Sequence, residues 1–310
     1  MPNWCCNRLY FRAEPARITD IHALLEGNLQ PYYPRAVQEG IQLFVAGCAG
    51  LLQSVEGSHY APFPALTAAG RGVVSPENLA FTRWLAMLAD RVVLDEAHCR
   101  VLHTCWQDSG LGERRWEGLS DGVQTAVAGL FDCKHFDWTG LWHKTGCGEW
   151  WNSLCDTTLP EKAQPLDMLL VLPVRLDVEI NGFNGTLMDG IPSAYDEYLT
   201  RFGTKWPQGH ELNISARGAD FIQADFDTPW SPPGEAVVAA LSRQYGCAIE
   251  HWYAEQGCDF CGYARYEGGE QVEALCDSLE WELADEDDED AYSDVTGPEW
   301  LINNVAHFGG

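Results

Sequence analysis

The spacing of apolar residues near the start of the chain predicts a strand followed by a helix. Residues 7–12 alternate between apolar and polar, with Leu9 and Phe11 on one face, which is the period of a half-buried strand. Over residues 16–26 the apolar positions recur at helical spacing, and Gly27 then ends the helix. The chain therefore opens with a β-α unit that has no partner strand nearby in the sequence.

A long and mainly helical stretch follows this unit. Residues 36–55 are apolar on most sides, which predicts a buried helix. Further helices are predicted over residues 76–90, 95–107, 118–131 and 148–155. The apolar run 167–174 is too short for its periodicity to separate a strand from a buried helix.

Beyond residue 204 the pattern becomes that of strands and hairpins. The predicted elements are strands over 212–215 and 221–226, a helix over 235–245, and a second hairpin over 247–254 and 260–266. Joined to the opening β-α unit, the first four of these complete the βαββαβ order of a ferredoxin-like sandwich.

The sequence therefore predicts an α+β fold with two domains. Residues 1–27 and 205–310 form the ferredoxin-like domain, which carries an acidic tail at residues 280–290. Residues 28–204 form a large, mainly helical insertion between its first helix and its second strand.

The charge of the chain indicates which kind of partner it binds. It has 19 Lys and Arg against 46 Asp and Glu, for a net charge of −27, and 22 of the acids but only 4 of the bases lie from Lys205 onward. Such a field repels nucleic-acid phosphates, because affinity for them comes largely from Lys and Arg, and it attracts basic surfaces. We therefore expect a basic protein partner and no direct binding to nucleic acid.

The sequence also indicates the cellular compartment in which the protein is expected. No stretch approaches the roughly 20 apolar residues that a membrane helix needs, and the first residues lack the basic and hydrophobic regions of a signal peptide. We therefore expect a cytoplasmic protein that does not bind membranes. The 12 cysteines are scattered along the chain and are expected to stay reduced there.

Recognisable catalytic and metal-binding motifs are scarce in this sequence. The sequence contains no phosphate-binding loop, dinucleotide fingerprint, nucleophile elbow or zinc-protease motif. One Cys/His group has ligand types that suit tetrahedral zinc: Cys247, His251, Cys258 and Cys261. Only Cys258 and Cys261 have the close spacing of a zinc knuckle. Buried thiols are therefore the preferred interpretation, zinc is the alternative, and no cofactor is assigned.

Candidate partner-binding residues gather around the predicted hairpins. Tryptophan is enriched among the residues that dominate binding energy, and two tryptophans lie in loops beside the predicted sheet edges. The alternative for both is that they cap the core. Nearby carboxylates suit a basic partner, and acid–base catalysis is an alternative for them. The candidates are Trp206, Trp230, Asp225, Asp227, Glu250, Glu255 and Asp259.

Four strings point to a known family. They are Met1-Pro-Asn-Trp-Cys5, Phe202-Gly-Thr-Lys-Trp206, Phe226-Asp-Thr-Pro-Trp-Ser-Pro-Pro233 and Tyr253-Ala-Glu-Gln-Gly-Cys-Asp-Phe-Cys-Gly262. In this order they resemble the YubB-like proteins carried by plasmids, integrative elements and phages. The resemblance implies a ferredoxin-like fold without an iron–sulfur cluster and a mobile genetic element as context. It implies no biochemical role.

Three classes of function remain. The favoured hypothesis is a non-catalytic acidic binding protein of a mobile genetic element, which antagonises a host defence or nucleic-acid-handling factor through a nucleic-acid-like acidic surface. The second is an interaction or assembly module whose acidity only confers solubility. The third is an enzyme of unrecognised type that uses Cys/His or paired carboxylates. Acids at phosphate-like intervals would favour the first, and an ordered cluster in a hollow the third.

Overall fold

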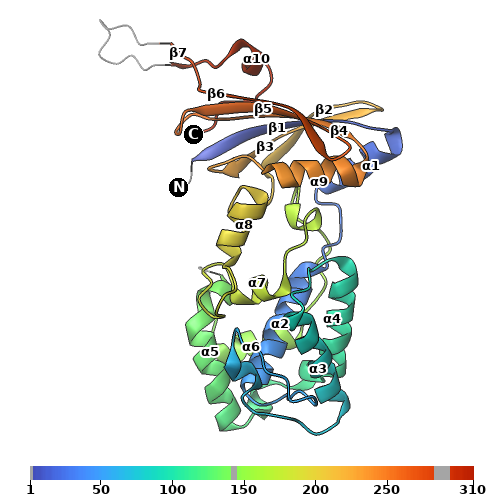
Figure 1. Ribbon diagram of the computed structural model, residues 1–310, viewed down its shortest axis with the longest axis vertical. Coiled ribbons are helices and arrows are strands. Elements are labelled where there is room, and N and C mark those ends of the chain that lie inside the picture. Colours follow the sequence, from blue (N-terminus) through green and yellow to red (C-terminus); the bar gives the residue numbers. More distant parts are fainter. Residues whose placement is uncertain (1–2, 141–144, 283–293) are drawn as a thin grey trace, which may run out of the picture. The chain divides into compact units, whose positions relative to one another are not determined.

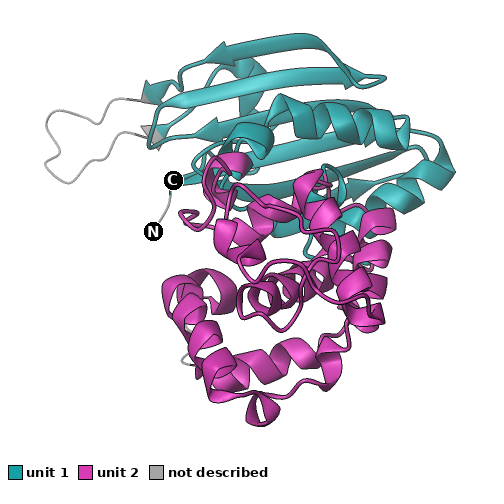
Figure 2. Ribbon diagram, turned by 60° about the horizontal axis from the view of Figure 1, so that its bottom comes forward, with its two compact units in different colours: residues 1–29, 162–172, 198–310 teal, residues 30–161, 173–197 magenta. Residues whose placement is uncertain are grey.

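The computed structural model describes residues 3–140, 145–282 and 294–310, and it divides into two compact units (Figure 2). Unit 1 comprises residues 1–29, 162–172 and 198–310, and unit 2 comprises residues 30–161 and 173–197. Each unit is therefore built from segments that are far apart in the sequence.

Unit 1 contains a six-stranded antiparallel sheet of order β2-β3-β1-β4-β5-β6 (Figure 1). Its strands are β1 (Trp4–Arg12), β2 (His210–Arg217), β3 (Phe221–Pro229), β4 (Ala248–Glu255), β5 (Phe260–Glu267) and β6 (Glu270–Asp277). The opening strand lies in the middle, where β1 pairs with both β3 and β4. The prediction that it joins the C-terminal sheet is confirmed.

Two helices cover one face of this sheet, α1 (Pro15–Leu25) and α9 (Glu235–Tyr245) (Figure 1). Their apolar stripes, which include Ile21 and Leu241, are buried together with Leu9 and Phe11 of β1. The chain order β1-α1-β2-β3-α9-β4 with strand order 2-3-1-4 confirms the ferredoxin-like fold. Strands β5 and β6 extend that sheet beyond β4.

The opposite face of the sheet is partly covered by the end of the chain. We call residues 295–310 the C-terminal strap; it contains α10 (Glu299–Ile302) and follows the short pair β7 (Trp281–Glu282) and β8 (Asp294–Val295). Leu301 and Val305 of the strap pack on Cys6 and Cys261. The Gly310 amide donates to the Trp4 carbonyl at 3.0 Å, which fastens the strap beside β1.

Unit 2 is helical. Its elements are α2 (Tyr33–Cys48), η1 (Pro64–Thr67), α3 (Pro76–Ala89), α4 (Glu96–Asp108), η2 (Leu111–Glu113), η3 (Trp116–Gly118), α5 (Asp121–Thr139), α6 (Cys147–Cys155), α7 (Leu176–Asn181) and the start of α8 (Ala194–Phe202). Helix α2 contacts α3, α4, α5, α6 and α7, which explains why it is apolar on most sides. A Cβ on Gly47 would lie 2.5 Å from the Phe81 ring, so glycine permits this packing.

Two predictions for this stretch need correction. The helix predicted over 36–55 ends at Cys48, because Gly50 has a φ of +72° and the Leu51 amide donates back to the Ala46 carbonyl. The helix predicted over 118–131 begins at Asp121 and runs on to Thr139. The ambiguous run 167–174 is neither strand nor α-helix and contains a single 3₁₀ turn, η4 (Met168–Leu170), which belongs to unit 1.

The helices and the acidic run can also be compared with what the sequence predicts for them. Across the described parts of the chain, none of the helices combines the length and the apolar character that crossing a membrane requires. Of the acidic run predicted to form a tail, residues 283–290 lie outside the described residues.

Candidate functional site

Strand β6 is the most exposed element of unit 1. All eight of its residues are exposed, and they include three acids, Glu270, Glu273 and Asp277. Two apolar side chains, Val272 and Leu275, are 52% and 46% exposed. The strand ends the sheet order, and no described strand pairs with its outer side. Strand β6 therefore offers a backbone edge flanked by acidic and apolar side chains.

The outer face of the sheet, opposite the helices, carries aromatic and charged residues. Tyr10 stacks on Phe221 with ring centres 5.6 Å apart, and Trp252 contacts Tyr263 at 5.2 Å. All four side chains are half-buried. Glu250 lies on this same face, because it is directly opposite Tyr10 in the pairing of β4 with β1.

Arg8 is the basic residue at the centre of this face. Its Nε donates to Asp225 Oδ1 at 2.5 Å and its Nη2 to Asp225 Oδ2 at 3.1 Å. Its Nη1 also donates to the Asn303 carbonyl of the strap at 3.2 Å. The fork of Arg8 therefore occupies both oxygens of Asp225 and helps to hold the strap. Asp225 is engaged inside the fold and is not available to a partner.

Two other predicted carboxylates also hold the fold together. Glu255 is fully buried, and its two oxygens accept hydrogen bonds from the Gly257 and Cys258 amides at 2.8 and 2.6 Å. The prediction that Glu255 contacts a partner is therefore wrong. Asp259 is exposed, but its Oδ1 accepts from the Leu279 amide at 3.1 Å, which positions the segment after β6.

The two predicted tryptophans lie close together. Trp206 and Trp230 are each 42% exposed, and the Lys205 ammonium lies between them, 4.7 Å from the Trp206 ring centre and 3.7 Å from that of Trp230. Trp230 adopts a φ of +71°, which is uncommon for a bulky residue. The two rings form a surface cage for a cation, which Lys205 fills.

The four residues of the alternative zinc site do not meet. Cys247, His251 and Cys261 are buried whereas Cys258 is exposed, and His251 bonds to Asn7 Oδ1 at 3.1 Å. Among the described residues, no three of these four place their ligand atoms within 4.8 Å of one another.

A different set of three potential metal ligands does lie close together. Over the described residues, one set of three potential metal ligands has its ligand atoms within 4.8 Å of one another: Cys6, Asp227 and His307. His307 Nε2 lies 3.1 Å from Asp227 Oδ1. The Asp227 carboxylate, and after it the Cys6 thiol, raise the pKa of His307 to about 10. The Gly309 amide opposes this rise, because it donates to His307 Nδ1 at 3.1 Å and favours the neutral ring.

Sequence reasoning missed this trio for a plain reason. Its members come from β1, β3 and the strap, so no local spacing connects them. The usable signal was partial: strands were predicted over 7–12 and 221–226, which stop one residue short of Cys6 and of Asp227, and the two residues pair only because both strands run further.

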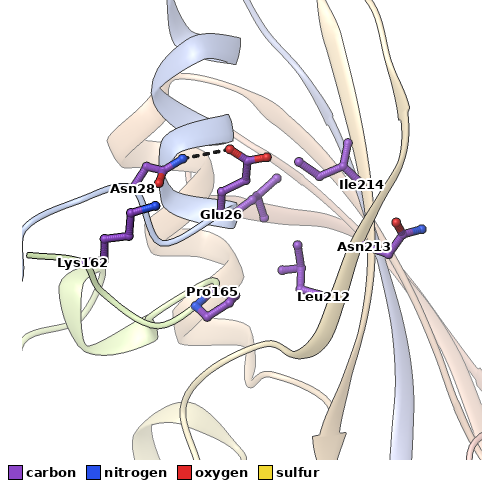
Figure 3. Close-up of a pocket in the computed structure, with 8 residues that line it drawn as sticks. Glu26, Asn28, Lys162, Pro165, Leu212, Asn213 and Ile214 are labelled. Atoms are coloured by element: carbon purple, nitrogen blue, oxygen red, sulfur yellow. Dashed lines mark hydrogen bonds between the residues drawn. The ribbon is translucent and has the colours of Figure 1, made fainter.

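Two open hollows lie among the described residues of unit 1. One, of roughly 600 Å³, lies beside the strap and is lined by His307, Phe308 and Gly309 together with Gln256, Gly257, Trp281 and Val295. The other, of roughly 610 Å³, lies between the end of α1, the loop at 162–165 and β2 (Figure 3).

The polar groups of the second hollow do not converge on a reacting position. Leu212 and Ile214 point into it from β2, as Figure 3 shows. Glu26, one of its two charged residues, accepts a hydrogen bond from Asn28 at 2.9 Å (Figure 3). The other is Lys162, an exposed side chain on the loop. The hollow resembles a surface groove at an edge strand more than a catalytic cleft.

Comparison with known proteins shows which family and which solved structure this chain is similar to. Residues 30–206 match the family described as "Protein of unknown function (DUF1281)", and residues 201–296 match "Ferredoxin-like domain in Api92-like protein". The crystal structure of protein api92 from Yersinia pseudotuberculosis is similar, with a TM-score of 0.82 and 32% identity, covering 89% of this chain and 98% of that one.

Two proteins of Escherichia coli K12 are similar in sequence. The "Uncharacterized protein YubA" is 56% identical over 162 residues, which are 52% of this chain and 96% of that protein. The "Uncharacterized protein YubB" is 56% identical over 146 residues, which are 47% of this chain and 99% of that protein. Each relative thus corresponds to about half of this chain, and the expected resemblance to YubB-like proteins is confirmed.

Proposed function

This chain belongs to the DUF1281 family, and we propose that it is a non-catalytic protein whose acidic edge strand β6 binds a basic, extended segment of a partner protein. The observation that carries the proposal is the outer side of β6, with which no described strand pairs and which bears acidic and exposed apolar side chains together. An extended peptide can add to such an edge through backbone hydrogen bonds.

Charge selects the kind of partner. Unit 1 has 26 Asp and Glu against 9 Lys and Arg, counted over its sequence segments. Glu267 and Glu280 lie at the two ends of the β6 region and add to the acids of the strand itself. A field of this sign raises the association rate of basic partners and disfavours acidic ones. The apolar Val272 and Leu275 then supply contact area that charge alone does not.

The spacing of the acids favours a peptide over imitation of a nucleic acid. At about 3.3 Å per residue, Glu270, Glu273 and Asp277 stand about 10 and 13 Å apart along the strand. Duplex DNA carries one charge per about 1.7 Å of its axis. The mobile-element context implied by the resemblance adds a finer proposal: the partner is a host factor for defence or nucleic-acid handling, since such factors carry basic segments.

The test uses a ten-residue peptide of alternating Lys and Val as probe. We expect it to bind the full chain and to slow amide hydrogen exchange in β6, with weaker binding as salt shortens the Debye length to about 8 Å at physiological strength. The variant Glu270→Lys with Glu273→Lys should lose this binding. The matched control, Glu56→Lys with Glu161→Lys, changes two exposed acids of unit 2 by the same charge and should retain it.

Two results would reject the proposal. Equal loss of binding in the control variant would mean that net charge alone attracts the peptide. Exchange protection that falls elsewhere and leaves the β6 amides unchanged would mean that the edge is not the site.

A further inference from the structure

Three side chains from distant parts of the chain meet on the outer face of the sheet. Cys6 on β1 is directly opposite Asp227 on β3, so the two side chains share that face. The strap then brings His307 over both of them, and the Sγ, carboxylate and imidazole ligand atoms all lie within 4.8 Å of one another. The three come from separate elements and are joined by no local turn.

We propose that Cys6, Asp227 and His307 bind a divalent transition-metal ion of the zinc type, which fastens the C-terminal strap to the sheet.

The ligand types select the class of metal. A thiolate, an imidazole and a carboxylate are the side chains that bind zinc. A thiolate in the set disfavours magnesium and calcium, which take oxygen ligands. Cobalt(II) shares the nitrogen and sulfur preference closely enough to serve as a spectroscopic substitute for zinc.

The Asp227 carboxylate gives an independent reason to place a cation at this position. Asp227 Oδ1 is buried and accepts no hydrogen bond from the described residues, although His307 Nε2 is only 3.1 Å away. An orphaned carboxylate oxygen in a buried position is costly, and a cation held between Asp227, Cys6 and His307 removes that cost.

The surroundings leave room for a fourth ligand. His307 is half exposed and also lines the hollow of roughly 600 Å³ beside the strap. Solvent or a small ligand reaches the trio from this side, whereas Cys6 is closed off from solvent by the packing of Leu301 and Val305. Three protein ligands with one open side is the arrangement of zinc sites that exchange their fourth ligand.

Loading the site has a cost that the structure identifies. A metal on Nε2 leaves a proton on Nδ1, so the Gly309 amide must turn away from that atom. The Cys6 thiol also loses its proton on binding. Metal affinity is therefore expected to rise with pH, because protons compete for two of the three ligands.

The experiment adds Co²⁺ to the reduced, full-length chain and follows the near-ultraviolet absorption of a cobalt–thiolate bond. The absorption should saturate at one ion per chain and disappear when Zn²⁺ is added in excess. If equimolar Co²⁺ produces no such absorption, the proposal is wrong.

Variants separate this site from the other cysteines. Cys6→Ser should abolish the absorption, and His307→Gln and Asp227→Asn should each lower affinity at least about tenfold. Cys258→Ser and Cys276→Ser, at exposed thiols, are the matched controls and should bind normally. Because His307 is half exposed, its substitution tests the proposal even if Cys6→Ser fails to fold. Normal binding by His307→Gln, or loss of binding in a control, would overturn it.

Discussion

Lowering the pH from 7 to 5 should destabilise unit 1 through one residue, His251 in β4. Its ring is buried, and burial lowers its pKa from the ordinary 6.5 to about 3. The tautomer follows from its neighbours. Asn7 Nδ2 donates to the Cys5 carbonyl at 2.8 Å and to Thr228 Oγ1 at 2.9 Å, which leaves Asn7 Oδ1 facing His251 Nε2. His251 therefore carries its proton on Nε2 and is neutral in the folded chain.

The direction and the size of this change in stability follow from proton linkage. Below pH 6.5 the unfolded chain protonates His251 while the folded chain does not, so the free energy of unfolding falls as pH falls, down to about pH 3. The slope for one proton is about 1.4 kcal/mol per pH unit. Between pH 6.5 and 5 the free energy of unfolding therefore falls by about 2 kcal/mol. At pH 7 almost none of this free energy has yet been lost.

The assay must report on unit 1 alone, because a chain with two units need not unfold in one step. Urea titrations at pH 7, 6 and 5, each read by a hydrogen-exchange pulse on β1 peptides, meet that need. His251→Gln keeps a donor for Asn7 but cannot titrate. It should be less stable than wild type at pH 7 and show a flatter decline toward pH 5. Equal slopes in the two proteins would refute the reasoning.

Two further predictions concern packing. Gly27→Ala should destabilise unit 1 at least twice as much as Gly246→Ala. Both glycines have a positive φ, but only at Gly27 would an added Cβ meet backbone, 2.4 Å from the Ala163 carbonyl oxygen. Urea titration measures the stability of both variants, and equal losses would contradict this prediction. Arg8→Met should cost about 3–5 kcal/mol by leaving the Asp225 carboxylate uncompensated. Adding Asp225→Leu should recover part of that loss, and a double variant no more stable than the single one would count against the argument.

Most of the sheet domain was predictable because its strands and helices have simple periods. The alternation of Leu9 and Phe11, and the stop at Gly27, predicted β1 and α1 closely. Helix α9 matches its predicted range. Strand β6 was not predicted, although Val272, Ala274 and Cys276 recur at the period of a strand; all of its residues are exposed.

The candidate sites were less predictable, because they depend on pairing over long distances. Trp206 and Trp230 were singled out, but Lys205, which joins them, was not. Among the carboxylates, composition could not separate Glu255, which holds a buried turn, from the exposed Glu273 on β6. Local sequence reports which side chains are present, whereas strand register decides which of them meet.

The central position of β1 has a consequence for how the chain is made. Arg8 and its partner Asp225 are 217 residues apart, and Asn7 and His251 are 244 residues apart. At a synthesis rate of about 5–20 residues per second, β1 waits roughly 10–50 s on the ribosome before its neighbouring strands exist. During that time Leu9 and Phe11 have no sheet to enter, and the helical segments of unit 2 are completed first. The sheet closes last, around the residues that were made first.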